Sequence, residues 1–235
     1  MSGDKPALIL ACDTTQAACS VALYKDGVIG HALLPMGKGH AEALIPMMDD
    51  VIAAAGCDMR DIDRLAVTQG PGTFTGTRVG LSAMRGLALA LGKPLKAYGT
   101  LAVMAQAIKS DLPAIVAVDA RRDIFYSQSF SPPENAVRKP LAPPQALSAD
   151  EAAALVVDGA IVLAGSGKHT LAARARGTVQ IDDGPDWPDA AQLAALAAQD
   201  TDWQDPPLPS PFYLRPPDAT LPDRAKFPAR ATPPR

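Results

Sequence analysis

The stretch RLAVTQGPGTFTGTRVGLSAMRGLALALG, residues 64–92, places three closely spaced glycines between an apparent strand and an apparent helix. Its first six residues form a short apolar run typical of a buried strand. Residues 77–92 carry apolar side chains at helical spacing and end at Gly92. A glycine-rich joint of this kind can bind phosphate groups, or it can simply turn the chain.

The joint does not match the common phosphate-binding fingerprints. A Walker A loop ends in Gly-Lys-Ser/Thr, whereas Gly76 is followed by Thr77 and Arg78. A dinucleotide fingerprint needs a third glycine where this chain has Thr75. What remains is a helix N-terminus with backbone N–H groups and threonine hydroxyls, so anion binding and a tight turn both stay open.

The N-terminal half predicts the element order β-β-β-α-β-α-β-α. A near-continuous apolar run and an alternating run that ends in Lys-Asp-Gly predict a hairpin, and a third strand follows. Pro46 predicts a kink in the first helix. The expected ranges are strands at 7–13, 19–27 and 28–35, a helix at 40–55, strand 64–69, helix 77–92, a short strand at 93–99 and a helix at 101–110.

The pattern then starts again. PAIVAVDARRDIFYSQSF, residues 113–130, repeats the design of LILACDTTQAACSVALY, residues 8–24, with Asp13 and Asp119 in equivalent places 106 positions apart. This predicts an internal duplication and a second domain. The expected units are domain 1–110, a smaller and degenerate domain 111–204, and a Pro-rich segment 205–235 made of an ordered Tyr-Leu-Arg anchor and a loose tail.

Composition limits the class of protein. The 235 residues are 48% apolar and carry a formal net charge of −3, which indicates a globular chain without a surface devoted to nucleic-acid phosphates. There is no signal-peptide pattern and no apolar run of membrane-spanning length, so we expect a cytoplasmic protein with no membrane contact. Cys12, Cys19 and Cys57 lack zinc or disulfide spacing and are predicted to be small apolar residues.

Asp13, Thr14 and Thr15 place an acid and two hydroxyls at the tip of the first hairpin, where they could orient a metal-bound water and a phosphate. With the glycine joint and the duplication, the chain resembles the actin, hexokinase and heat-shock-protein ATPase superfamily. That superfamily has a duplicated, ribonuclease H-like α/β fold. The resemblance implies two domains, each with a mixed sheet flanked by helices.

Within that superfamily, HAEALIPMMDDVIAAAG and RLAVTQGPGTFTGTRVGLSAMRGLALALGKPL resemble the TsaB (YeaZ) family. The resemblance is strong over residues 7–110 and weaker at DARRDIFYSQSF and PFYLRP. It implies a bacterial subunit that dimerises with TsaD in making threonylcarbamoyladenosine in tRNA. TsaE, an ATPase, is expected in the complex, and TsaC supplies the threonylcarbamoyl-adenylate. The resemblance further implies contact with tRNA only through the complex, while the exposed apolar face would favour a homodimer in the absence of TsaD.

The family docks through the helices that correspond to residues 40–55 and 77–91. The first of these has more apolar surface than one core-facing stripe requires, in a sequence that includes adaptable methionines. The residues expected at the partner interface are His40, Leu44, Met47, Met48, Val51, Arg78, Leu81, Met84 and Arg85.

The resemblance also implies that the chain is not itself catalytic. TsaD carries a metal-binding HxxxH pair where this chain has Ala102 and Gln106. Neither a metal nor a required cofactor is therefore expected. The candidate nucleotide-binding residues are interpreted as a relic that leaves room for weak or interfacial ATP or ADP binding; they are Asp13, Thr14, Gly70, Gly72 and Thr73.

Two enzymatic alternatives stay open. A metal-independent peptidase is one, because the wider superfamily is glycoprotease-like. The missing HxxxH and the lack of a nucleophile motif count against it. A small-molecule phosphotransferase of the same fold is the other. It would need a second phosphate loop, for which Arg121 and Arg122 are candidates, although the residue pattern favours a solvated hairpin turn with a cross-turn ion pair at Asp123.

Overall fold

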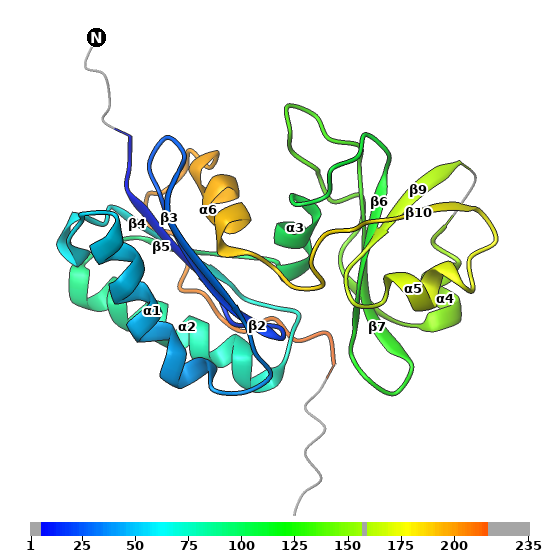
Figure 1. Cartoon of the computed structure of the whole chain (residues 1–235), viewed down its shortest axis with the longest axis horizontal. Helices are drawn as coiled ribbons and strands as arrows, with labels where there is room; N and C mark the ends of the chain where they lie inside the picture. Colours follow the sequence, from blue (N-terminus) through cyan, green and yellow to red (C-terminus); the bar gives the residue numbers. More distant parts are fainter. Residues whose placement is uncertain (1–5, 157–158, 216–235) are drawn as a thin grey trace, which may run out of the picture.

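The first sheet contains β1 (Ile9–Asp13), β2 (Ala18–Tyr24), β3 (Val28–Pro35), β4 (Arg64–Thr68) and β5 (Leu95–Tyr98). The computed structural model, which describes residues 6–156 and 159–215, gives this sheet the order β3-β2-β1-β4-β5 (Figure 1). β1, β2 and β3 form an antiparallel meander, while β4 and β5 run parallel to β1. The carboxyl ends of β1 and β4 therefore meet at one edge of the sheet.

The second sheet repeats this pattern. It contains β6 (Ala114–Asp119), β7 (Ile124–Phe130), β8 (Gln145–Ser148), β9 (Ala160–Ala164) and β10 (Thr178–Ile181), in the order β10-β9-β6-β7-β8. β6 pairs antiparallel with β7 and parallel with β9, as β1 does with β2 and β4. The duplicated fold predicted from the sequence is thus confirmed. The predicted elements did not include β8 and β10, which have only four residues each.

Two helices cover the outer face of each sheet. α1 (His40–Ala54) and α2 (Phe74–Leu91) pack on the first sheet, and the shorter α4 (Ala149–Ala153) and α5 (Lys168–Ala172) pack on the second. α1 is a single helix that includes Pro46, so it is not divided there. A short 3-10 turn, η1 (Met59–Asp61), leads from α1 into β4.

The remaining helices lie between the two sheets (Figure 1). α3 (Thr100–Ala105) follows the last strand of the first sheet, but its Leu101 and Met104 pack against the second sheet. α6 (Ala190–Ala198) follows the last strand of the second sheet, but its Leu193 and Ala197 pack against the first. Each half of the chain therefore gives its third helix to the other half, and α3 and α6 also contact each other.

This exchange corrects the domain boundaries expected from the sequence. Residues 189–204 were assigned to the second domain, yet α6 and the following Trp203 are part of the core of the first. The reason is that an apolar helix pattern does not specify which sheet the helix covers. Residues 206–210 continue along the first domain, while the predicted loose tail at 216–235 lies outside the described residues.

Two further predictions concern single features. Cys12 and Cys19 are buried in the first core as expected, whereas Cys57 is only half-buried, and all three are free thiols. Among the described residues, no helix has the length and apolar character needed to cross a membrane.

Candidate functional site

The glycine joint lies directly against the tip of the first hairpin. Thr15 O accepts a hydrogen bond of 2.8 Å from the backbone N–H of Thr73. A Cβ atom on Gly72 would lie 2.5 Å from the same carbonyl oxygen, and one on Gly76 would overlap the Thr14 carbonyl. Glycine is required at both positions because the two chain segments touch through their backbones.

Polar backbone groups in the first turn of α2 form hydrogen bonds with other groups of the protein. Thr73 is its N-cap, and Thr73 Oγ1 accepts a 3.2 Å hydrogen bond from the N–H of Gly76. The helix therefore begins at Phe74, three residues before the predicted start. The hydroxyl of Thr14 donates to Gly76 O at 2.7 Å and accepts from Gly80 N at 3.0 Å. The N–H groups of Thr73, Gly76 and Gly80, which could have faced a phosphate, therefore donate to acceptors within the protein.

Asp13 is fully buried at the end of β1. Its Oδ2 atom accepts hydrogen bonds from the hydroxyls of Thr68 and Thr15, and its Oδ1 accepts from Thr15 N at 3.1 Å. Burial raises the pKa of Asp13 to about 7, although these hydrogen bonds act in the opposite direction. Thr15 also accepts from the hydroxyl of Thr100 at 3.2 Å, so the carboxyl group belongs to a closed polar network that joins β1, β4 and α3.

The five candidate nucleotide-binding residues do not share one cavity. Asp13 and Thr14 are buried in this network, and Gly70 is covered by the C-terminal segment, because a Cβ there would lie 2.6 Å from Phe212 O. Gly72 and Thr73 instead line an open cleft between the two domains. A nucleotide site made by all five side chains and backbones together is not formed by the described residues.

The interdomain cleft has a volume of about 320 Å³. The first domain contributes Gln16 and residues 72–75, and the second contributes residues 118–121 and Tyr126. Tyr213 and Arg215 of the C-terminal segment complete its wall, and Arg215 Nη1 donates to Ala120 O at 3.4 Å. The C-terminal segment thus contacts both domains.

The second half carries a counterpart of the glycine joint, which sequence inspection missed. Gly165-Ser166-Gly167 connects β9 to α5 as the first joint connects β4 to α2. Ser166 Oγ accepts from Asp119 N at 2.9 Å, and Gly167 N donates to Ala117 O at 2.9 Å. The signal that could have found it is the same strand, Gly-x-Gly and helix pattern. Like the first joint, it closes on its own hairpin.

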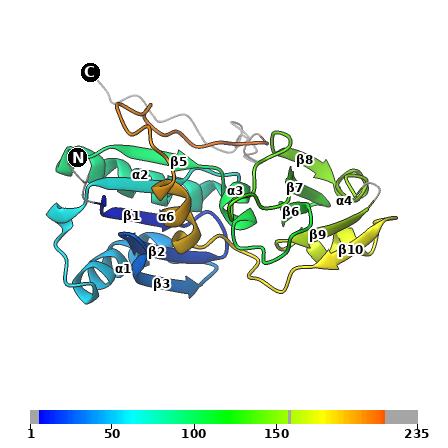
Figure 2. The same ribbon diagram turned by 90° about the horizontal axis from the view of Figure 1, so that it is seen from above.

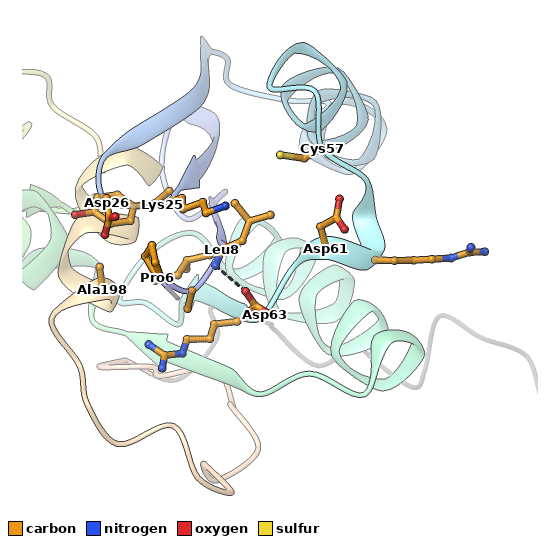
Figure 3. Close-up of a pocket in the computed structure, with 13 residues that line it drawn as sticks. Pro6, Leu8, Lys25, Asp26, Cys57, Asp61, Asp63 and Ala198 are labelled. Atoms are coloured by element: carbon orange, nitrogen blue, oxygen red, sulfur yellow. Dashed lines mark hydrogen bonds between the residues drawn. The ribbon is translucent and has the colours of Figure 1, made fainter. Parts of the chain in front are cut away.

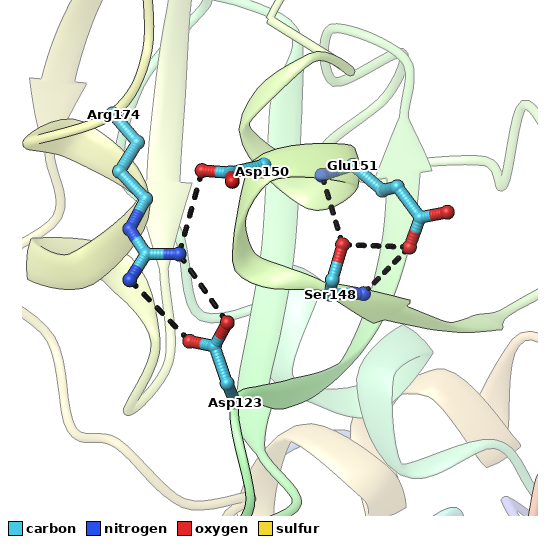
Figure 4. Close-up of polar contacts among 5 residues, drawn as sticks. All are labelled: Asp123, Ser148, Asp150, Glu151 and Arg174. Carbon is cyan, nitrogen blue, oxygen red and sulfur yellow. Dashed lines mark hydrogen bonds and ion pairs between the residues drawn. The ribbon is translucent and has the colours of Figure 1, made fainter.

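The candidate anion-binding turn of the second domain is held by an ion pair. Arg121, Arg122 and Asp123 all have positive φ, at 66°, 56° and 57°. Arg174 lies 3.4 Å from a carboxylate oxygen of Asp123 and 3.4 Å from one of Asp150 on α4 (Figure 4). Arg174 therefore links this turn to α4 and to the residues that follow α5, and the turn itself has a left-handed backbone that is uncommon for residues other than glycine.

A large cavity of about 960 Å³ lies at the opposite edge of the first sheet (Figure 3). Its charged groups are balanced between cations and anions: Lys25, Arg60, Arg64, Asp26, Asp61 and Asp63. Asp63 already accepts from Leu8 N at 2.9 Å and lies 3.7 Å from Lys93, and Arg64 lies over the ring of Trp203. These contacts indicate a structural cluster.

The structure divides the nine predicted interface residues. Met47 and His40 are half-buried, and the His40 ring lies 3.0 Å from Gln16 O at the start of α1, while Arg78 and Arg85 are exposed on α2. The other five are buried in the core of the first domain, and of these only Leu44 also lines the groove between the two helices; they are Leu44, Met48, Val51, Leu81 and Met84. Because α1 carries apolar residues on both its core-facing side and its exposed side, the sequence alone could not show which of them face the core.

An exposed groove does lie between these two helices. It has a volume of about 480 Å³ and is lined mainly by apolar and small residues: Ala41, Leu44, Ile45, Phe74, Thr75, Arg78, Val79, Ser82 and Ala83. Ile45 and Phe74 are 44% and 42% exposed. Neither is among the predicted interface residues, because Ile45 has the same helical spacing as the core residues of α1 and the sequence predicts Phe74 to lie in the joint before the helix. A large apolar residue between two threonines of the joint was the available signal.

The positions aligned with the HxxxH pair have structural roles. Gln106 Nε2 donates to Ala102 O and to Arg138 O, both at 3.1 Å. Among the described residues, no group of three or more His, Cys, Asp and Glu side chains could hold a metal ion.

Comparison with known proteins places the chain in a family. A family model described as TsaD, tRNA N6-adenosine threonylcarbamoyltransferase, matches residues 34–164, more than half of the chain. The tRNA threonylcarbamoyladenosine biosynthesis protein TsaB of Escherichia coli (strain K12) is 36% identical over 132 residues, which cover 55% of this chain and 57% of that protein. The chain thus spans about half the length of the curated TsaB proteins that it matches.

Other relatives match over nearly the whole chain. An uncharacterized protein of Mycobacterium tuberculosis (strain ATCC 25618 / H37Rv) is 32% identical over 224 residues, which cover 93% of this chain and 97% of that protein. The solved structure of YeaZ from Pseudomonas aeruginosa has a TM-score of 0.74 at 28% identity and covers 82% of this chain and 91% of its own. With the family model and the two duplicated sheets, these matches show that the chain belongs to the TsaB (YeaZ) family.

Proposed function

We propose that this chain is a non-catalytic partner subunit of the machinery that makes threonylcarbamoyladenosine in tRNA, and that it binds a TsaD-type transferase through the groove between α1 and α2. The observation that carries the proposal is the groove itself, with Ile45 and Phe74 both more than two-fifths exposed. Neighbouring large apolar side chains that stay exposed on a folded chain are typical of a protein-binding surface.

The exposed charges on the two helices that flank the groove support docking in one orientation. The exposed charges of α1 are acidic, at Glu42, Asp49 and Asp50, while those of α2 are basic, at Arg78 and Arg85. A partner with the opposite arrangement of charges would be held in a single register, because reversing it would bring like charges together.

The closed hairpin tip supports the non-catalytic part of the proposal. Asp13 and Thr14 are bonded within the protein, so we infer that the chain needs no nucleotide of its own and that the transfer chemistry takes place on the partner. The formal net charge of −3 supports contact with tRNA only through the complex. The proposal includes TsaE as a further component, TsaC as the source of the activated substrate, a cytoplasmic location and self-association when the transferase is absent.

The test is a binding measurement with the TsaD-type transferase of the same cell. Ile45→Asp puts a charge into the groove, and we expect the dissociation constant to rise about thirtyfold or more, the effect of losing an interface hot spot. Leu141→Asp is the matched control, since Leu141 is 65% exposed on the second domain, and it should bind like wild type. Threonylcarbamoyl transfer to tRNA should fall with binding in the first variant only.

Two results would contradict the proposal. Equal binding by both variants would show that the groove is not the docking surface. Hydrolysis of ATP or of a peptide by the chain alone, at a rate that falls on Asp13→Asn substitution, would show a catalytic role and would favour one of the enzymatic alternatives.

A further inference from the structure

The C-terminal segment 206–215, called the strap below, runs from the edge of the first sheet to the second domain. Its residues 206–210 line a cavity with Lys96, Ala97 and Tyr98 of the edge strand β5. Figure 2 shows the strap in orange above β5, passing toward the second sheet. The strap therefore lies close to the joint that precedes α2.

The backbone of the strap is fixed on the glycine joint. Phe212 N donates a 2.7 Å hydrogen bond to Gln69 O, directly before the first glycine. A Cβ atom on Gly70 would lie only 2.6 Å from Phe212 O, so the strap leaves no room for a side chain at this glycine. The close approach holds the next strap residue, Tyr213, beside the start of α2.

Tyr213 forms the end of a stacked row of side chains. Its ring stacks on that of Phe74, with centroids 5.4 Å apart and an interplanar angle of 26°. The guanidinium carbon of Arg78 lies 3.6 Å from the Phe74 centroid and 5.8 Å from that of Tyr213. Stacking and cation–π contacts of this kind restrict the orientations of exposed side chains.

The row connects two separate cavities. Phe74 and Arg78 line the docking groove, whereas Phe74 and Tyr213 line the interdomain cleft, so Phe74 forms a wall of both. Tyr213 is not among the residues that line the groove. Any effect of Tyr213 on docking would therefore pass through Phe74 and Arg78.

We propose that Tyr213 is a positioning residue for the docking groove: its ring holds Phe74 and Arg78 in the orientation that shapes the end of the groove for the partner. This inference rests on the proposed function. It makes the strap, and not only the two helices, a determinant of affinity for the transferase. The strap also links the groove to the second domain, because Arg215 bonds to Ala120.

The experiment measures binding of the full chain to the same transferase. Tyr213→Ala should weaken binding about threefold to tenfold, the effect of losing one aromatic pair, while Tyr213→Phe keeps the ring and should stay within about twofold of wild type. Phe212→Ala is the matched control, because Phe212 has a similar exposure of 39% and fixes the strap through backbone atoms. It should also bind within about twofold of wild type.

A double-mutant cycle separates positioning from direct contact. If Tyr213 acts through Phe74 and Arg78, then adding Tyr213→Ala to a chain that already carries Phe74→Ala and Arg78→Ala should weaken binding no further. Additive losses would overturn the inference, because they would show that Tyr213 touches the partner itself. Unchanged binding by Tyr213→Ala, alongside the loss in Ile45→Asp, would overturn it while leaving the proposed function intact. If the Ile45 variant binds normally, the proposed function fails instead. Urea unfolding of each variant verifies that it is folded. Tyr213→Leu, which removes the aromatic ring but keeps a bulky apolar side chain, replaces Tyr213→Ala if the alanine variant does not fold.

Discussion

The hydroxyl of Thr14 donates a 2.7 Å hydrogen bond to the carbonyl oxygen of Gly76 and so joins the hairpin tip to the first turn of α2. The hydroxyl oxygen of Thr14 also accepts a 3.0 Å hydrogen bond from the N–H of Gly80, one turn further along α2. Both glycines lie where a side chain would collide with Thr14. The glycines of the joint are therefore needed for packing of the helix against the hairpin, whether or not a ligand binds nearby.

This contact predicts opposite effects for two glycine substitutions in the same helix. Gly76→Ala should lower the free energy of unfolding by about 3 kcal/mol, because its Cβ would force apart two backbone segments. Gly86→Ala should raise it by about 0.5–1 kcal/mol, since Gly86 is exposed, has nothing within 4 Å of its Cβ position, and alanine favours the helix. Urea unfolding measures both. Equal effects would contradict the close approach.

The raised pKa of Asp13 predicts a dependence of stability on pH. Because the native pKa is about 7 and the ordinary value is 3.8, the folded protein binds more protons than the unfolded chain between these pH values. The contribution of this group is therefore present at low pH and is lost as pH rises through about 7. Asp13→Asn should gain stability relative to wild type between pH 5 and pH 8.

The measurement for Asp13 is urea unfolding at both pH values. Asp49→Asn, an exposed carboxylate on α1, controls for the loss of one negative charge. A difference between Asp13→Asn and wild type that does not change with pH would show that the carboxyl group does not titrate between pH 5 and pH 8, and would contradict a native pKa near 7.

Substitutions at the neighbouring positions Arg138 and Lys139 should differ strongly in their effect on the stability of the protein. Its guanidinium group is buried and donates to the backbone oxygens of Ser110, Leu112 and Ser131. Arg138→Met would leave these acceptors without partners and should cost about 3 kcal/mol. Lys139→Met removes only an exposed ion pair with Glu134 and should have little effect. Thermal unfolding compares them, and similar midpoints would contradict the role of Arg138.

Because α6 packs against the first sheet, weakening this helix should destabilise the first sheet rather than the second. Leu193 is fully buried against the first sheet, so Leu193→Ala should lower stability by about 2–5 kcal/mol, whereas Leu208→Ala at a 66% exposed position should not. Amide hydrogen exchange should accelerate first in β1 and β2 of the Leu193 variant. Loss of protection confined to β6 and β7 would instead support the domain boundary expected from the sequence.

Local patterns predicted most of the fold. The buried run ending at Asp13, the alternating strand after it and their repetition before Asp119 were enough to predict two similar domains, and the structure confirms both sheets. The patterns failed where the answer depends on distant residues. Nothing in the sequence of α6 indicates that Leu193 meets Ile9 and Ala22 rather than the strands next to it along the chain.

The candidate site was predictable to a smaller extent. The two docking helices could be named from their resemblance, but α1 has apolar residues on two faces, so Met48 and Ile45 could not be assigned to the core and the surface. The contribution of Tyr213 was also hidden, because stacking on Phe74 joins residues 139 positions apart. A Tyr-Leu-Arg anchor was expected from the sequence, but not the joint that it covers.

The exchange of α3 and α6 has a consequence for the ancestry of the fold. A primitive chain with only one of the two halves would leave the inner face of its sheet uncovered, because the helix that follows its last strand reaches out to another sheet. Two copies of such a chain would cover each other by trading that helix. Gene fusion would then have made permanent a pairing on which each separate copy already depended.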